Sequence, residues 1–189
     1  MAAPRDSLAP PSPEQAAFLE RAMQQYGKAT YNFAFRLTGN ESDARDLTQD
    51  AFVRVYRAWR SFQPGTSFLS WIYRIVTNLY RDELRRRKGR FHEQIPEDNA
   101  PQAFGGQRPL AVTPIEDYVD RQLGEPLSKA LAQLSVEQRQ VVILADIEEY
   151  SYQEIAEIMG CSIGTVRSRL LRARALLRRL VERARQQQP

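Results

Sequence analysis

The chain has 189 residues, 42% of them hydrophobic, a length that suits one medium domain or two small ones. Basic residues number 27 and acidic residues 23, and all but three of the basic residues are arginine. A single cysteine and a single histidine exclude a disulfide framework and a multi-histidine metal site. The sequence has no apolar run long enough to span a membrane, no signal-peptide pattern and no glycine-rich phosphate loop. We therefore expect a cytoplasmic protein without membrane insertion that is not an enzyme and needs no metal or cofactor.

Four helices are predicted in the first half of the chain. Ser12 is suited to cap a helix, with Pro13 at its first position and Gln15 completing a capping box. Further helices are expected over 29–38, 42–59 and 68–87, where apolar residues recur at helical spacing. The expected inward residues of the first, third and fourth helices are Phe18, Ala22, Met23, Tyr26, Ala44, Leu47, Ala51, Val55, Ala58, Phe68, Ile72, Ile75, Val76 and Leu79.

A breaker-rich segment then divides the chain. Residues 91–123 contain several prolines and a Gly-Gly pair without a sustained hydrophobic period, which predicts a flexible linker. The linker is acidic, whereas 81–90 before it and 151–189 after it are basic. We expect a disordered tail over 1–12, a domain over 13–90, the linker, a second domain over 124–184 and a tail over 185–189. The predicted fold class is all-α, with two small helical domains.

The second domain contains the pattern of a helix-turn-helix. Ser151 and Glu154 form a capping box before a short helix over 152–159, and Gly160 can end that helix in the left-handed conformation. Ser162 can cap a longer helix over 163–185, so two helices are joined by a short turn. The expected inward residues are Ile155, Ala156, Met159, Val166, Leu170, Ala173 and Leu177, and Cys161 is interpreted as a small buried turn residue.

The outward face of the longer helix is suited to a DNA major groove. An arginine there can bind guanine in bidentate fashion, and a leucine can contact a thymine methyl. A solvated basic helix face is the alternative interpretation. The outward stripe consists of Thr165, Arg167, Ser168, Leu171 and Arg172, and neighbouring Arg169, Arg174, Arg178 and Arg179 could reach phosphates.

Two further surfaces are predicted in the first domain. Asp46, Gln49 and Asp50 share one helix face, which could receive a basic partner helix or be merely solvated. A second, mostly cationic ridge is predicted opposite the core and could follow single-stranded nucleic acid whose bases stack on nearby aromatic rings. The ridge consists of Arg74, Asn78, Arg81 and Arg85, the rings are those of Phe62, Trp71, Tyr73 and Tyr80, and the run from Arg85 to Lys88 could attract phosphates. Packing of Phe62 or Trp71 in the core is the alternative for the rings.

Taken together, the chain resembles a bacterial extracytoplasmic-function (ECF) sigma factor of the sigma-70 family. The resemblance covers about residues 14–184 and is carried by three stretches of sequence. These stretches are Asp43-Ala-Arg-Asp-Leu-Thr-Gln-Asp-Ala-Phe52, Trp71-Ile-Tyr-Arg-Ile-Val-Thr-Asn78 and the helix-turn-helix over 150–170. Sigma domains two and four would then be present, and a third domain would have no room.

The resemblance implies a role for each surface. Asp46, Gln49 and Asp50 would bind the coiled coil of the largest subunit of core RNA polymerase, and domain four would lie near the polymerase flap. The recognition stripe defined above, Thr165 to Arg172, would read the −35 element of promoter DNA, and an anti-sigma factor would control the protein. The melted non-template strand of the −10 element would be bound by Phe62, Gln63, Gly65, Ser67, Arg74, Asn78, Arg81 and Arg85.

Two other classes of protein are alternatives to the sigma factor. A repressor or activator could use the same helix-turn-helix, but it would not need the acidic face or the cationic ridge and would usually bind a palindrome as a dimer. A nucleic-acid-processing enzyme would need clustered carboxylates or histidines for a metal. The acidic residues are instead expected on solvated helix faces and in the linker, which disfavours the enzyme.

Overall fold

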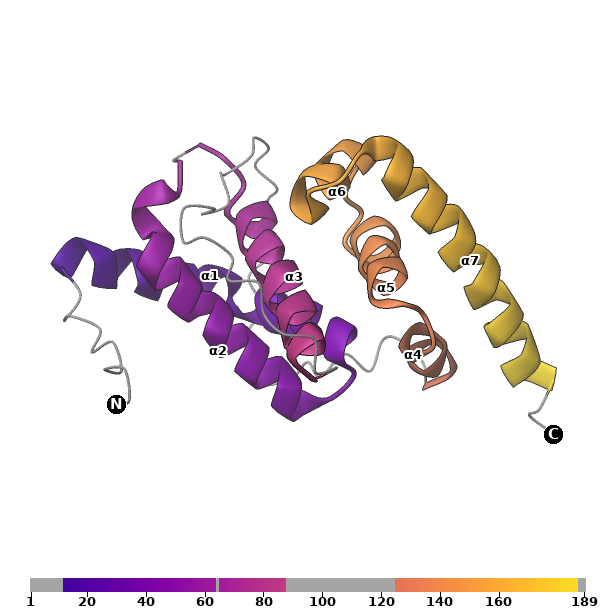
Figure 1. The fold of residues 1–189 in the computed structure, drawn as a ribbon. Helices are drawn as coiled ribbons and strands as arrows, with labels where there is room; N and C mark the ends of the chain where they lie inside the picture. Colours follow the sequence, from indigo (N-terminus) through magenta and orange to yellow (C-terminus); the bar gives the residue numbers. More distant parts are fainter. Residues whose placement is uncertain (1–11, 64, 88–124, 187–189) are drawn as a thin grey trace, which may run out of the picture.

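The computed structural model describes residues 12–63, 65–87 and 125–186, which form two helical lobes (Figure 1). The N-terminal lobe contains α1 (Pro13–Thr38), α2 (Glu41–Ala58), the short 3-10 turn η1 (Trp59–Ser61) and α3 (Phe68–Arg87). The C-terminal lobe contains α4 (Glu125–Ala132), α5 (Val136–Val142), the π-helical turn η3 (Ile143–Ile147), α6 (Tyr152–Met159) and α7 (Ile163–Gln186). The predicted all-α class is confirmed, while the predicted linker over 91–123 lies outside the described residues. None of the described helices combines the length and the apolar character that crossing a lipid bilayer requires.

Helix α1 joins two helices that the sequence predicted to be separate. The chain remains helical from Pro13 to Thr38, so the predicted start of a new helix at residue 29 is wrong. Gly27 lies inside α1, where a glycine costs about 1 kcal/mol relative to alanine. Phe33 and Leu37 are fully buried beyond it, and the burial of such side chains outweighs that cost. Met23, which was predicted to point inward, is 48% exposed.

The ends of α1 are fixed by local hydrogen bonds. The Ser12 Oγ atom accepts a hydrogen bond from the Gln15 backbone N–H at 3.2 Å, as predicted. The Gln15 side chain does not complete the capping box, because its Nε2 atom donates to the carbonyl of Tyr56 at 2.7 Å. At the other end, Gly39 adopts a φ of 77°, the left-handed conformation that ends many helices. The short connection at Gly39 lets α2 pack antiparallel beside α1.

Helices α2 and α3 complete the core of the N-terminal lobe. Both match the predicted ranges closely, and α2 begins at Glu41 because the Asn40 side chain accepts from the Asp43 backbone N–H. Trp71 and Tyr73 of α3 are fully buried, and the Tyr73 ring stacks on Phe33 with 4.1 Å between ring centroids. Of the inward residues predicted for these two helices, all are buried except Ala58 and Leu79, which are half-buried.

Helices α6 and α7 form the predicted helix-turn-helix. Ser151 and Glu154 cap α6 reciprocally, and Gly160 ends it with a φ of 62°. The Ser162 Oγ atom accepts from the Thr165 backbone N–H at 3.1 Å, so the chain restarts as α7 after a turn. Cys161 lies half-buried in that turn. The predicted inward residues are buried except Leu177, which is half-buried, and together they fix α7 against α6 and α5.

The two lobes pack directly on one another. Helix α3 lies against α6, as Figure 1 shows, and α1 contacts α5 and η3. The buried apolar residues of the two lobes form one continuous cluster. Arg139 of α5 crosses between them, with its guanidinium donating to the carbonyl of Leu37 at 2.6 Å. The C-terminal lobe therefore covers one side of α3 and part of α1.

Candidate partner-binding and nucleic-acid surfaces

The acidic and amide-bearing face of α2 is open to solvent. Asp46, Gln49 and Asp50 are all exposed, as expected for a surface that receives a partner. They line one wall of a hollow of about 390 Å³ between α2 and α3. The opposite wall includes Leu79 and Leu84 of α3. The hollow thus offers apolar contact beside carboxylate and amide acceptors, which suits a basic amphipathic helix.

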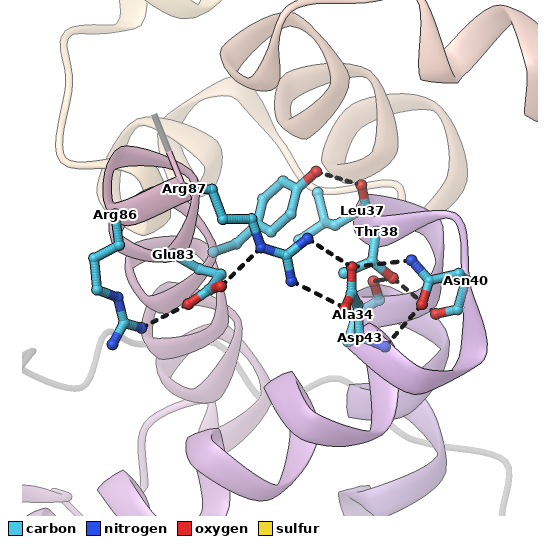
Figure 2. Close-up of polar contacts among 9 residues, drawn as sticks. Ala34, Leu37, Thr38, Asn40, Asp43, Glu83, Arg86 and Arg87 are labelled. Carbon is cyan, nitrogen blue, oxygen red and sulfur yellow. Dashed lines mark hydrogen bonds and ion pairs between the residues drawn. The ribbon is translucent and has the colours of Figure 1, made fainter. Parts of the chain in front are cut away.

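A charged cluster of Asp43, Glu83 and Arg87 lines this hollow, and its polar contacts are drawn in Figure 2. The two terminal nitrogens of Arg87 donate to the Asp43 carboxylate at 3.1 and 3.0 Å, and its Nε atom donates to Glu83 at 2.8 Å. Asn40 donates a further hydrogen bond to Asp43 at 3.0 Å. The planar fork of Arg87 therefore ties the last turn of α3 to the first turn of α2.

The cluster changes the ionisation of its members. The hydrogen bond from Arg87, followed by that from Asn40, holds the pKa of Asp43 below its usual value. The same contacts with Asp43 and Glu83 raise the pKa of Arg87. Reasoning from the sequence missed this cluster, because residues 43 and 87 are far apart in the chain and only packing of α2 against α3 brings them together.

The basic run at the end of α3 is engaged within the lobe. Arg85 pairs with Asp82 at 3.4 Å and Arg86 with Glu83 at 2.8 Å, while Arg87 pairs with Asp43. The sequence predicted this run as a phosphate attractor. All three guanidinium groups are exposed but already have carboxylate partners, which a phosphate would have to displace.

The loop between η1 and α3 contains four predicted strand-binding residues. Gln63 and Gly65 are exposed, with Gly65 in the left-handed region at a φ of 91°. Phe62 is half-buried, and its ring lies 5.4 Å from that of Trp71 between centroids. Ser67 is buried, where its Oγ atom accepts from the Ser70 backbone N–H at 3.2 Å. Gln63, Gly65 and one side of Phe62 are thus accessible to a ligand, whereas Ser67 has a structural role at the start of α3.

The predicted cationic ridge of α3 is not the open face that the sequence indicated. The Arg81 guanidinium reaches into the C-terminal lobe, donating to Gln140 Oε1 at 3.3 Å and to the carbonyl of Met159 at 3.2 Å. Burial lowers the pKa of Arg81 and also that of Arg74, near which Glu157 of α6 acts in the opposite direction. Asn78 is half-buried between them. Of the ridge predicted opposite the core, Arg85 is exposed and the other three members are half-buried, because periodicity identifies a polar face but not the lobe that packs near it.

Helix α7 presents the most accessible of the predicted stripes. Arg167, Leu171 and Arg172 are exposed, with Leu171 74% exposed. A single exposed leucine is common on protein surfaces, so it is its place between two exposed arginines of the stripe that suits a contact with DNA. The stripe lies near the start of α7, next to the turn from α6, as major-groove recognition by a helix-turn-helix requires.

Hydroxyl groups of the same stripe are used within α7. The Thr165 hydroxyl pairs with that of Ser162 at 2.9 Å, and the Ser168 hydroxyl donates to the carbonyl of Thr165 at 3.0 Å. Both residues are half-buried. Arg174, predicted to reach phosphates, instead donates to Asp146 at 3.2 Å through its Nε atom. The guanidinium groups of Arg167 and Arg172 are therefore the main polar groups that the stripe can offer.

Within the described ranges, no cluster of three or more histidine, cysteine or acidic side chains could hold a metal ion. The groups that these surfaces offer are carboxylates and an amide on α2, aromatic rings and arginine around α3, and arginine with leucine on α7.

Comparison with known families assigns both lobes. Residues 22–90 match the family described as sigma-70 region 2, and residues 124–177 match sigma-70, region 4. The ECF RNA polymerase sigma factor SigE of Mycolicibacterium smegmatis is 42% identical over 159 residues, which are 84% of this chain and 60% of that protein. The ECF RNA polymerase sigma factor SigW of Bacillus subtilis is 30% identical over 168 residues, which are 88% of this chain and 89% of that protein.

Solved structures give the same relationship at the level of the fold. A chain of the co-crystal structure of the sigma factor RpoE with the anti-sigma factor NepR from Bartonella quintana has a TM-score of 0.64 and 29% identity. That match covers 88% of this chain and 97% of the other. The structure of CnrH with the cytosolic domain of CnrY has a TM-score of 0.59 at 24% identity, a likeness of fold alone.

Proposed function

The chain belongs to the ECF RNA polymerase sigma factors of the sigma-70 family, and from that premise we propose that it binds core RNA polymerase and directs transcription initiation at specific promoters. The observation that carries the proposal is the occurrence of regions 2 and 4 in one chain, each with an exposed binding face. The chain itself catalyses no reaction and acts in the cytoplasm, where polymerase and DNA are found.

We infer a division of labour between the two domains. The domain over 13–90 binds core polymerase through Asp46, Gln49 and Asp50. It holds the melted −10 strand with the loop and ridge residues Phe62, Gln63, Gly65, Arg74, Asn78, Arg81 and Arg85, and the buried Ser67 contributes by fixing the start of α3. The domain over 124–184 reads the −35 duplex with Thr165, Arg167, Ser168, Leu171 and Arg172. An acidic linker over 91–123 joins them, so that two weak DNA contacts act together at high effective concentration.

We also infer that an anti-sigma factor controls this chain. The support is the similarity to RpoE, which was crystallised in complex with the anti-sigma factor NepR. The partner would have to mask at least one of the faces described above, because each is needed for initiation.

The test of the proposed function is run-off transcription with bacterial core polymerase. The wild-type chain is expected to bind core polymerase and to start transcripts at defined promoters. Replacing Asp46 and Gln49 together by alanine should weaken core binding about tenfold or more, since about 1.4 kcal/mol corresponds to a factor of ten. The matched control is Glu20→Ala with Gln24→Ala, an exposed carboxylate and amide at the same kind of spacing on α1.

Two outcomes would overturn the proposal. One is a wild-type chain that does not bind core polymerase. The other is an Asp46 and Gln49 variant that binds as well as the α1 control. Dimeric binding to a palindromic duplex in the absence of polymerase would instead indicate a repressor or activator.

A further inference from the structure

The contact between the two lobes covers the ridge of α3 that is proposed to hold promoter DNA. Gln140 of α5 is fully buried there, donating to the carbonyl of Thr77 at 3.4 Å and accepting from Arg81. Arg139, one residue earlier, donates to Leu37 of α1 and to the Tyr80 hydroxyl. The C-terminal lobe therefore uses side chains, not only shape, to hold the polar side of α3.

Glu148, which follows η3, makes the charged contact of this interface. Its carboxylate forms an ion pair with Arg36 of α1, and both side chains are only 14% exposed. It also accepts a hydrogen bond at 2.9 Å from the hydroxyl of Tyr73, a fully buried residue of α3. One carboxylate from the C-terminal lobe thus joins α1 and α3 of the other lobe in surroundings that exclude most water.

The backbone beside Glu148 is in an unusual conformation. Glu149 has a φ of 56°, and it is the one non-glycine residue with positive φ in the described part of the chain. That conformation disfavours residues with a side chain, and it turns the chain from η3 toward Tyr150, whose ring meets Tyr73 edge-on at 5.9 Å. The positive φ of Glu149 costs conformational energy, and the turn that it makes places Glu148 and Tyr150 against α3.

Arg81 shows why the interface can be exchanged for DNA. Its guanidinium is largely withdrawn from water, yet the acceptors that it meets, an amide oxygen and a backbone carbonyl, are both neutral. A phosphate group would be a stronger ligand, because its negative charge adds Coulombic attraction to the guanidinium and its oxygens can accept two parallel hydrogen bonds from it. The same nitrogens cannot serve the C-terminal lobe and a DNA strand at once.

We propose that the closed chain is self-masked: its C-terminal lobe occupies the strand-binding ridge of α3, and Glu148 is the latch that holds it there. Opening of the lobes frees Arg81, Asn78 and Arg74 together. The inference rests on the proposed function, since it takes these residues as the ones that hold the −10 strand. It adds that the chain needs no second protein to hide them.

The experiment uses the full chain and a fluorescein-labelled single-stranded DNA of mixed sequence. Glu148→Gln keeps the size of the side chain but removes the charge that pairs with Arg36. Small-angle X-ray scattering should show a larger radius of gyration, and fluorescence anisotropy should show about tenfold tighter binding of the DNA, since opening raises the competent fraction. Tyr73→Phe, which loses only the hydroxyl, should show the same two changes to a smaller extent.

Two controls test whether the change in shape is specific to Glu148 and whether the gain in DNA binding depends on the α3 ridge. Glu182→Gln makes the same change at an exposed position of α7 and should leave both readouts unchanged. Arg81→Ala in the Glu148→Gln background should abolish the gain in DNA binding while the chain stays expanded. Circular dichroism of each variant establishes that the helices are intact, and Tyr73→Phe alone decides the question if Glu148→Gln does not fold.

The outcomes separate this inference from the proposed function. Folded variants that stay compact overturn the latch, and an expanded chain that binds DNA no better overturns the masking. A wild-type chain inactive in run-off transcription overturns the proposed function whatever the scattering shows. Expansion with a gain in binding that depends on Arg81 supports the closed, self-masked state.

Discussion

Helices α3 and α7 both carry arginine at helical spacing, yet the fold leaves the two sets in different surroundings. On α7, Arg167 and Arg172 lie in solvent beside an exposed leucine. On α3, Arg81 is half-buried against the other lobe, and its guanidinium donates to two neutral acceptors there. The closed chain therefore exposes its duplex-reading face but covers Arg81 of its strand-holding ridge, so full binding of a single strand requires the lobes to separate.

The largest effect is expected from the open face. Replacing Arg167 and Arg172 together by alanine should lower the affinity of the holoenzyme for promoter duplex about a hundredfold, because each bidentate contact with guanine is worth about 1–3 kcal/mol. An electrophoretic mobility shift assay, with promoters selected by run-off transcription, measures the change. When the same two arginines are replaced in the Glu148→Gln chain, the gain in single-strand binding caused by Glu148→Gln should be unchanged.

A pair of arginines farther along the same helix is the control for that experiment. Arg178 and Arg183 are exposed beyond the stripe, and their replacement by alanine should cause a small loss that is equal for all sequences. If both double variants lose the same affinity on intact and altered −35 elements, the stripe binds phosphates and does not read bases.

A smaller effect is expected from the contact that covers α3. Arg36→Met leaves Glu148 without its cation, but the lobes can separate and let the carboxylate hydrate. The loss is thus limited to the free energy of docking, about 2 kcal/mol for a hydrogen bond to a charged group. Calorimetry should show one cooperative transition in the wild type, whose buried cluster is continuous, and two in the variant.

Arg45→Met is the matched control, because Arg45 pairs with Glu41 on the surface of α2. Surface pairs contribute about 0–1 kcal/mol, so this variant should keep a single transition. A single transition in Arg36→Met, merely shifted to lower temperature, would mean that the ion pair stabilises the whole chain and does not hold the lobes together.

Local features of the fold could be predicted from the sequence where the signal lies within a few residues. The capping box at Ser151, the left-handed Gly160 and the cap at Ser162 each depend on residues only a few positions apart, and together they predict the helix-turn-helix. The same reasoning erred in starting a new helix at residue 29, since α1 continues through Gly27 and the burial of Phe33 and its neighbours outweighs the cost of that glycine.

Contacts between distant residues could not be predicted in this way. No short-range pattern pairs Asp43 with Arg87 or Arg36 with Glu148, because each pair depends on how whole helices pack. The α3 ridge illustrates the same limit: its spacing was read correctly as polar, but the side chains that cover it belong to a segment beyond residue 123. The family resemblance supplied roles for these residues without indicating which of them the closed chain exposes.

The smallest effect concerns the uncovered end of α3, where Asp43 and Arg87 act within one lobe. Because the pKa of Asp43 is lowered in the folded chain, chiefly by its hydrogen bond from Arg87 and then by that from Asn40, the folded state gains stability from it above the unfolded pKa of about 3.9. That gain is lost as the pH falls through the lower folded value. Asp43→Asn removes it at every pH.

Urea denaturation as a function of pH should therefore show the wild type more stable than Asp43→Asn near neutrality, with the difference shrinking below about pH 4. The effect is small because the pair is exposed, and added salt should reduce it further. If Asp43→Asn instead expanded the chain in scattering, the uncovered end of α3 would also take part in closure, and the contrast between the two parts of this helix would fail.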